Sequence, residues 1–173
     1  FKMKICLITN GFELHAALFR KTVQRRIPVE FADNGMRIAL AVEPALGKAE
    51  SYRIEPVDGG WQIVGSDELG LYYGIGKFLH TAVWENGEFV PNPPEGTKTP
   101  ACDFRAIYFP FHHYQWYHLA PMEELEDYAE QMLLWGYNTI VCITPNINVF
   151  SYQDEAFVTV TERVRTLFRC IKC

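Results

Sequence analysis

Hydrophobic and polar positions along the first half of the chain predict strands and helices in alternation. Residues 2–9 form a compact apolar run of β-prone side chains that Asn10 and Gly11 interrupt. Apolar residues then recur every three or four positions, as on one face of a helix, until Pro28. These positions are Phe12, Ala16, Phe19, Val23 and Ile27. Residues 36–43 return to a strand-like pattern, so the order begins strand, helix, strand.

A hairpin and a buried helix are predicted next. Residues 52–56 alternate apolar and polar side chains, Asp-Gly-Gly at 58–60 marks a turn, and the four residues after it form the returning strand. Ser66 and Asp67 provide a helix cap, and the helix is expected to run to about Val83. Its apolar side chains lie on most sides of the helix, which is typical of a buried element.

The second half of the chain has a different pattern. Residues 84–101 contain four prolines and little periodicity, which indicates a domain boundary near residue 100. Residues 104–109 predict a short strand, Pro121 opens a helix, and residues 138–144 are a continuous β-branched run. Strand, helix and buried strand form a βαβ unit with an expected right-handed crossover. Residues 154–171 fit a further amphipathic helix.

The fold class is therefore predicted to be α/β, with one domain at residues 1–100 and a second at residues 101–173. Within the last helix, residues 158–161 fit a strand equally well, and the pattern leaves both open.

Composition and charge exclude some partners. The net charge of −5 argues against a nucleic-acid partner, because phosphate binding needs a basic stripe. A cluster of basic residues fits a solvated helix face: Arg20, Lys21, Arg25 and Arg26. No stretch approaches the ~20 apolar residues that span a bilayer, so no membrane partner is expected. There is no signal peptide, yet the opening residues indicate a start other than the native one, so the compartment stays open, a secreted or periplasmic parent included.

The five cysteines predict neither a disulfide scaffold nor a cofactor. Cys6 and Cys142 lie in apolar runs, where a thiol behaves as a small hydrophobe. Cys170 and Cys173 form a lone CxxC without a second ligand pair. We therefore expect no metal and no cofactor, and keep a metal- or redox-linked protein as an alternative hypothesis.

The connection at residues 110–120 is the most informative anomaly. It has eleven residues where strand-to-helix loops usually take about two to six. It carries His112, His113 and Trp116 among other aromatic residues, and it follows the carboxyl end of a strand, where ligands gather in parallel α/β folds. Flat rings beside hydrogen-bonding groups suit a sugar. The alternative is that these aromatic side chains only cap the core.

Arg105 is a second candidate for a sugar contact. An arginine in an apolar strand must be paired or must face a polar site, because an unpaired charge costs free energy when buried. It would either bind sugar hydroxyl groups at the same rim as the loop or pair with an acid. Catalytic carboxylates are not predicted, since Glu123, Glu124 and Asp154 fit the first turns of helices.

Two stretches together resemble a known family. Residues 50–83 are similar to the accessory domain that precedes the barrel in β-N-acetylhexosaminidases (glycoside hydrolase family 20) and related α-glucuronidases. The matching positions are Glu50, Tyr52, Ile54, Gly70, Tyr73 and Gly74. Residues 103–144 resemble the first strand, helix and second strand of the (β/α)8 barrel. Arg105 matches an arginine that holds the terminal sugar, and Gly136-Tyr-Asn138 matches the entry into strand two.

This resemblance implies an α+β accessory domain followed by the first βαβα units of a TIM barrel. It implies a parent enzyme that hydrolyses O-glycosidic bonds, with a carbohydrate substrate and with Arg105, His112, His113 and Trp116 as substrate-binding residues. The family has a histidine and an aspartate after strand two, where this chain has Val141 to Asn146. Its Asp–Glu catalytic pair lies at strand four, beyond residue 173, so the isolated chain is expected to be inactive. The alternative is a non-catalytic carbohydrate-binding or docking module. We also expect exposed strand edges to promote a homodimer.

Overall fold

The structure is a computed structural model that describes residues 2–111, 116–143 and 153–171. Its contacts divide the chain into two compact units. The first unit comprises Phe1–Asp103 with Leu134–Gly136, and the second comprises Phe104–Leu133 with Tyr137–Cys173. The predicted mixed α/β class is confirmed.

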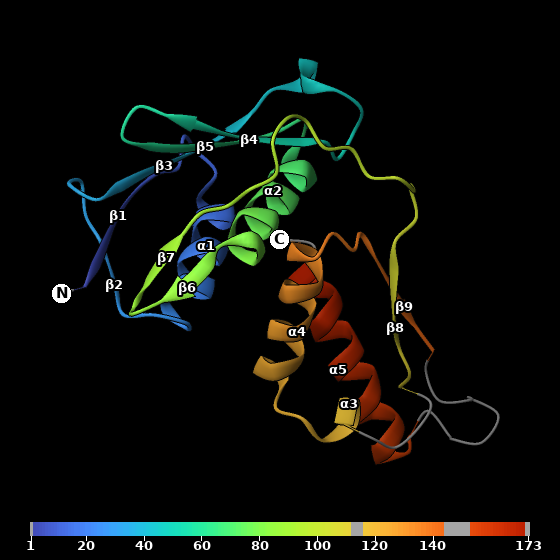
Figure 1. Cartoon of the computed structure of the whole chain (residues 1–173). Coiled ribbons are helices and arrows are strands. Elements are labelled where there is room, and N and C mark those ends of the chain that lie inside the picture. The colour runs from blue at the N-terminus through green and yellow to red at the C-terminus, as the bar shows by residue number, and fades with distance from the viewer. Residues whose placement is uncertain (1, 112–115, 144–152, 172–173) are drawn as a thin grey trace. The chain divides into compact units, whose positions relative to one another are not determined.

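A five-stranded sheet forms the centre of the first unit (Figure 1). Its strands, in spatial order, are β2 (Val29–Phe31), β1 (Met3–Ile8), β3 (Met36–Val42), β5 (Gly60–Gly65) and β4 (Tyr52–Val57). The first four are parallel, and β4 is an antiparallel edge strand that forms the predicted hairpin with β5. A short 3-10 helix, η1 (Pro44–Leu46), follows β3. Pro56 is tolerated in β4 because an edge strand can lack one N–H donor.

Strand β2, which has three residues and lies beside the first half of β1, was not predicted from the sequence. After β2 the chain passes to the other side of β1, where β3 pairs with the second half of that strand. Gly35 lies at this passage, and a Cβ there would be 2.3 Å from the carbonyl carbon of Lys4. The close approach to the backbone of β1 therefore requires glycine.

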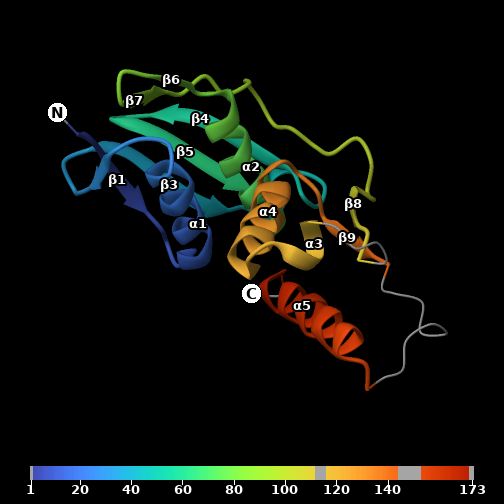
Figure 2. The same cartoon turned by 90° about the horizontal axis from the view of Figure 1, so that it is seen from below.

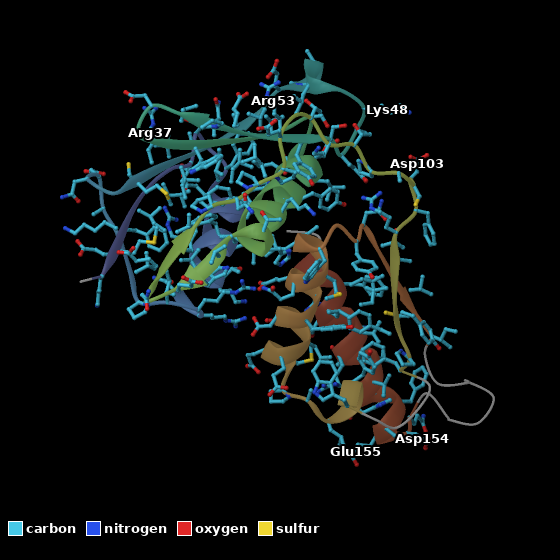
Figure 3. The ribbon with its side chains drawn as sticks, viewed as in Figure 1. Arg37, Lys48, Arg53, Asp103, Asp154 and Glu155 are labelled. Atoms are coloured by element: carbon cyan, nitrogen blue, oxygen red, sulfur yellow. The ribbon has the colours of Figure 1, made fainter. Side chains whose placement is uncertain are left out.

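Both long helices of the first unit, α1 (Glu13–Gln24) and α2 (Glu68–Thr81), lie on the same face of the sheet (Figures 1 and 2). The core between them contains Ile38, Leu40, Ile63 and Phe78, all fully buried. Arg37 and Arg53 lie on the other face (Figure 3). Arg53 forms ion pairs with Glu43 at 3.4 Å and Glu55 at 3.0 Å. One face of this sheet is thus covered by helices, and the other carries charged side chains among its residues.

The predicted cap of α2 is confirmed. One carboxylate oxygen of Asp67 accepts a hydrogen bond from the Gly70 N–H at 2.7 Å, and the other accepts one from the Glu50 N–H at 2.7 Å. The buried Ser51 donates its N–H to the Ser66 hydroxyl at 3.0 Å. The segment before β4 and the start of α2 are therefore joined by one hydrogen-bond network.

The stretch before the expected domain boundary contains a small hairpin that was not predicted from the sequence. Its strands are β6 (Val83–Glu85) and β7 (Glu88–Val90). Asn86-Gly87, at the turn, was the available signal, but three-residue strands are too short to show a period of two. Phe89 of β7 is buried and packs edge-on against Phe78, with ring centroids 5.9 Å apart.

The second unit has two parallel strands and three helices in its described residues. They are β8 (Ala106–Phe109), α3 (Trp116–Leu119), α4 (Met122–Leu134), β9 (Thr139–Cys142) and α5 (Glu155–Ile171). Parallel pairing of β8 with β9 confirms the predicted βαβ order, and α5 is a helix through the stretch where a strand was the alternative. Its core contains Phe109, Phe111, Leu125, Val160 and Leu167.

Candidate functional site

Arg105 immediately precedes β8, at the amino end of that strand. Its N–H donates to the side-chain oxygen of Asn138 at 3.1 Å, and its carbonyl accepts the N–H groups of Asn138 at 3.0 Å and Thr139 at 3.2 Å. The 110–120 connection begins at the other end of the strand, about 13 Å further along at ~3.3 Å per residue. The structure therefore does not bring Arg105 and the start of this connection to one rim.

Asn138 has a structural role that explains the match at Gly136-Tyr-Asn138. Its side-chain oxygen accepts from the Arg105 N–H and from the Thr139 hydroxyl, so one side chain holds the amino ends of β8 and β9 together. We expect Asn138→Ala to lower the free energy of unfolding by about 1–3 kcal/mol, because it removes an acceptor from a partly buried N–H.

Urea denaturation tests this expectation. Asn138→Asp is the matched control, since a carboxylate keeps an acceptor in the same place and should cost less than alanine does. Equal losses from both substitutions, or none from alanine, would contradict the role given to Asn138.

Trp116 lies at the start of α3, and its ring is held from two sides. Its indole contacts Tyr117 edge-on at 5.3 Å and Tyr128 edge-on at 5.8 Å. The residue is still 42% exposed. A fixed aromatic ring with accessible surface can stack on the apolar C–H face of a sugar. His112 and His113, the neighbouring candidates, lie outside the described residues.

The two tyrosines that contact Trp116 pack in turn on buried aromatic side chains. Phe109 and Phe111 are fully buried, and Tyr117 and Tyr128 each lie within 6 Å of the Phe109 ring. Burial, followed by the neighbouring Tyr128, raises the pKa of Tyr117, so its phenol stays neutral and can donate a hydrogen bond. The helical spacing of Tyr128 indicated only a core position, so its contact with Trp116 was not predictable from the sequence.

Three further features limit the chemistry of the described residues. Burial raises the pKa of Cys142, at the carboxyl end of β9, to about 11, so at neutral pH this thiol is protonated and a poor nucleophile. Asp154 and Glu155 lie at the amino end of α5 (Figure 3). This is the expected place for acidic side chains whose negative charge interacts favourably with the helix dipole. Within residues 2–111, 116–143 and 153–171, no three His, Cys, Asp or Glu side chains are grouped to hold a metal ion.

No helix in the described part of the chain is long and apolar enough to cross a bilayer.

No protein-family model matches the sequence, and no curated protein matches it. Solved structures do resemble it. A GH138 enzyme that targets pectin rhamnogalacturonan II matches 98% of this chain at 13% identity with a TM-score of 0.64. The GH20 β-N-acetylhexosaminidase of Streptomyces coelicolor A3(2) matches 81% at 16% identity with a TM-score of 0.58. A GH115 4-O-methyl-α-glucuronidase with specificity for decorated arabinogalactans matches 92% at 15% identity with a TM-score of 0.57.

These similarities cover only part of each enzyme. The chain spans 23% of the GH138 structure, 30% of the GH20 structure and 28% of the GH115 structure. At these identities the similarity establishes the fold alone. At that level the resemblance inferred from the residues is confirmed: most of this chain has the fold of one portion of GH20 β-N-acetylhexosaminidases and related glycoside hydrolases.

Proposed function

We propose that the chain is part of a glycoside hydrolase that cleaves O-glycosidic bonds, and that its sugar contacts lie at the carboxyl end of β8. Residues 1–100 would be the accessory domain, and residues 101–173 would begin the (β/α)8 barrel. The observation that carries the proposal is the exposed, edge-held ring of Trp116, which follows the carboxyl end of a parallel strand. This is where barrel enzymes hold their substrates.

The proposed role of the chain is to bind the substrate, and the acid that protonates the leaving oxygen would come from the rest of the parent enzyme. Two further candidates, His112 and His113, belong to the same connection and stay part of the proposal. Arg105 contributes only if its side chain reaches along the strand from the amino end. A hexosaminidase is the more specific form of the proposal, and a homodimer through the strand edges stays a prediction.

Substitution of Trp116 tests the sugar contact. Chitotetraose should bind the wild-type chain weakly, and Trp116→Ala should weaken this binding about fivefold or more in a saturation-transfer NMR titration, because one lost stacking ring removes about 1 kcal/mol or more. Leu119→Ala is the matched control, since Leu119 lies on the same short helix and is 64% exposed. No saturable binding by the wild type, or equal loss in both variants, would contradict the proposed contact.

Turnover separates an enzyme from a binding module. The 173-residue chain should give no rate on aryl N-acetylglucosaminides, while its full-length parent should hydrolyse glycosides. A parent that binds saccharides but hydrolyses none of a broad glycoside panel would favour the non-catalytic carbohydrate-binding module.

A further inference from the structure

Arg163, on the face of α5 that packs in the second unit, makes one hydrogen bond to the short helix α3 and one to the residue that directly follows it. Its Nε donates to the Tyr117 carbonyl at 2.9 Å, and one terminal nitrogen donates to the Ala120 carbonyl. Tyr117 lies within α3 and Ala120 directly follows its last residue, and the last carbonyl groups of a helix have no partner within it. A guanidinium group satisfies such carbonyls well, because it carries donors in a fixed planar fork.

His118, a residue of the same short helix, makes a further contact that holds it. The imidazole Nε2 is 2.8 Å from the carbonyl of Phe111, to which it donates when that nitrogen carries the proton. A helix of four residues has little stability of its own, because few backbone hydrogen bonds offset the cost of ordering it. In α3 the Ala120 N–H donates to the Trp116 carbonyl and closes the turn. Contacts from outside the helix must therefore hold Trp116 in place.

We propose that Arg163 is a positioning residue, which holds α3 and thereby presents the Trp116 ring for sugar stacking. The sugar part of this inference rests on the proposed function; the positioning part rests on the two hydrogen bonds alone. Arg163 would not touch the sugar. Its contribution would be to reduce the conformational freedom that the Trp116 ring must lose when a sugar binds.

The environment of the guanidinium supports this role. Arg163 is half-buried, and burial lowers its pKa from the ordinary arginine value, although the group stays charged at neutral pH. A partly desolvated charge is stable only with hydrogen-bond partners, and the two carbonyls of the α3 segment provide them. Arg165, two residues along the same helix, is exposed and forms an ion pair with Glu162. Arg165 is therefore a matched control for Arg163, because the two arginines lie on the same helix and only Arg163 bonds the α3 segment.

Fluorine NMR of protein labelled with 5-fluorotryptophan measures the positioning directly. The Trp116 resonance is assigned by its absence in Trp116→Phe. In Arg163→Met it should shift and broaden, because the indole samples more than one orientation, while Arg165→Met should leave it unchanged. Arg163→Lys, which keeps the charge but loses the planar fork of donors, should give an intermediate spectrum. The affinity for chitotetraose should fall about three- to tenfold in Arg163→Met, as expected for loss of hydrogen bonds worth about 1 kcal/mol.

An unchanged Trp116 resonance in folded Arg163→Met, or an equal change in Arg165→Met, would overturn the inference. If Arg163→Met does not fold, Arg163→Gln, which keeps one donor, takes its place with the same expected shift. Failure of the wild-type chain to bind sugar, together with a shifted resonance, would refute the proposed function and leave the positioning role intact.

Discussion

Replacing Gly70 with alanine should destabilise the first unit by about 3 kcal/mol or more, although the same change stabilises an exposed helix by about 1 kcal/mol. A Cβ at Gly70 would lie 2.2 Å from the carbonyl oxygen of Ser51. That oxygen is a backbone atom, so it cannot rotate away as a flexible side chain could. The clash must move either α2 or the segment before β4.

The surroundings of Ser51 make such a movement costly. Its carbonyl accepts the Ser66 N–H at 2.8 Å, its N–H donates to the Ser66 hydroxyl, and its hydroxyl is 2.9 Å from that of Thr99. Displacing the Ser51 segment would strain several of these bonds together, and each buried group left without its partner costs about 1–3 kcal/mol.

Urea unfolding of Gly70→Ala measures the effect. Leu69→Ala is the control on the same helix, because Leu69 is 37% exposed and its truncation should cost less. A Gly70→Ala variant as stable as the wild type, or more stable, would show that α2 does not approach the Ser51 backbone as closely as described.

Acidification should destabilise the first unit through His80. Burial, assisted by the positive charges of Arg26 and Lys77, lowers the pKa of His80 from 6.5 to about 4. Its Nε2 is buried without a hydrogen-bond partner in the described part of the chain. The folded state therefore favours the neutral ring, whereas the unfolded chain takes up a proton near pH 6.5.

The sign of the effect follows from this difference. Above pH 6.5 both states hold a neutral His80, and stability is at its full value. As the pH falls from 6.5 to about 4, the unfolded state binds a proton that the folded state does not, so the free energy of unfolding decreases. The loss is at most about 3 kcal/mol at ~1.36 kcal/mol per pH unit, and solvent access to the half-buried ring makes it smaller.

Chemical denaturation at several pH values between about 7 and about 4 tests the His80 effect. In His80→Phe the free energy of unfolding should change less steeply with pH, because the titrating group is gone and an aromatic ring is kept. A smaller slope should remain from His15, whose pKa burial also lowers. A slope in His80→Phe equal to that of the wild type would assign the acid sensitivity to other groups.

Hydrophobic periodicity was sufficient to predict the long elements of both units. Three of these elements are the helix after Phe12, the helix after Pro121 and the strand after Asn138. In each of them the spacing of apolar residues along the sequence indicates the type of element. The Asp67 cap was equally predictable, because a cap depends on local sequence. Local patterns of this kind specify an element without knowledge of its neighbours.

Elements set by tertiary contacts were not predictable. Strand β2 and the hairpin β6–β7 have strands of only three residues, and Gly35 is required only because the chain passes over β1. Within the candidate site, Trp116 was identified from the long connection, but Arg163 was missed because no sequence signal links residues 43 positions apart. Likewise, the sequence placed Arg105 in a strand but could not show that it lies at the end opposite the start of the 110–120 connection.

Paramagnetic relaxation by a nitroxide-labelled chito-oligosaccharide tests the central claim most directly, with 5-fluorotryptophan in all four tryptophan positions as the reporters. If the carboxyl end of β8 faces a saccharide, the Trp116 resonance should broaden at a lower sugar concentration than the resonances of Trp61, Trp84 and Trp135, and unlabelled sugar should restore it. Equal broadening of all four resonances, or earlier broadening of any other tryptophan, would contradict a sugar-facing surface at Trp116.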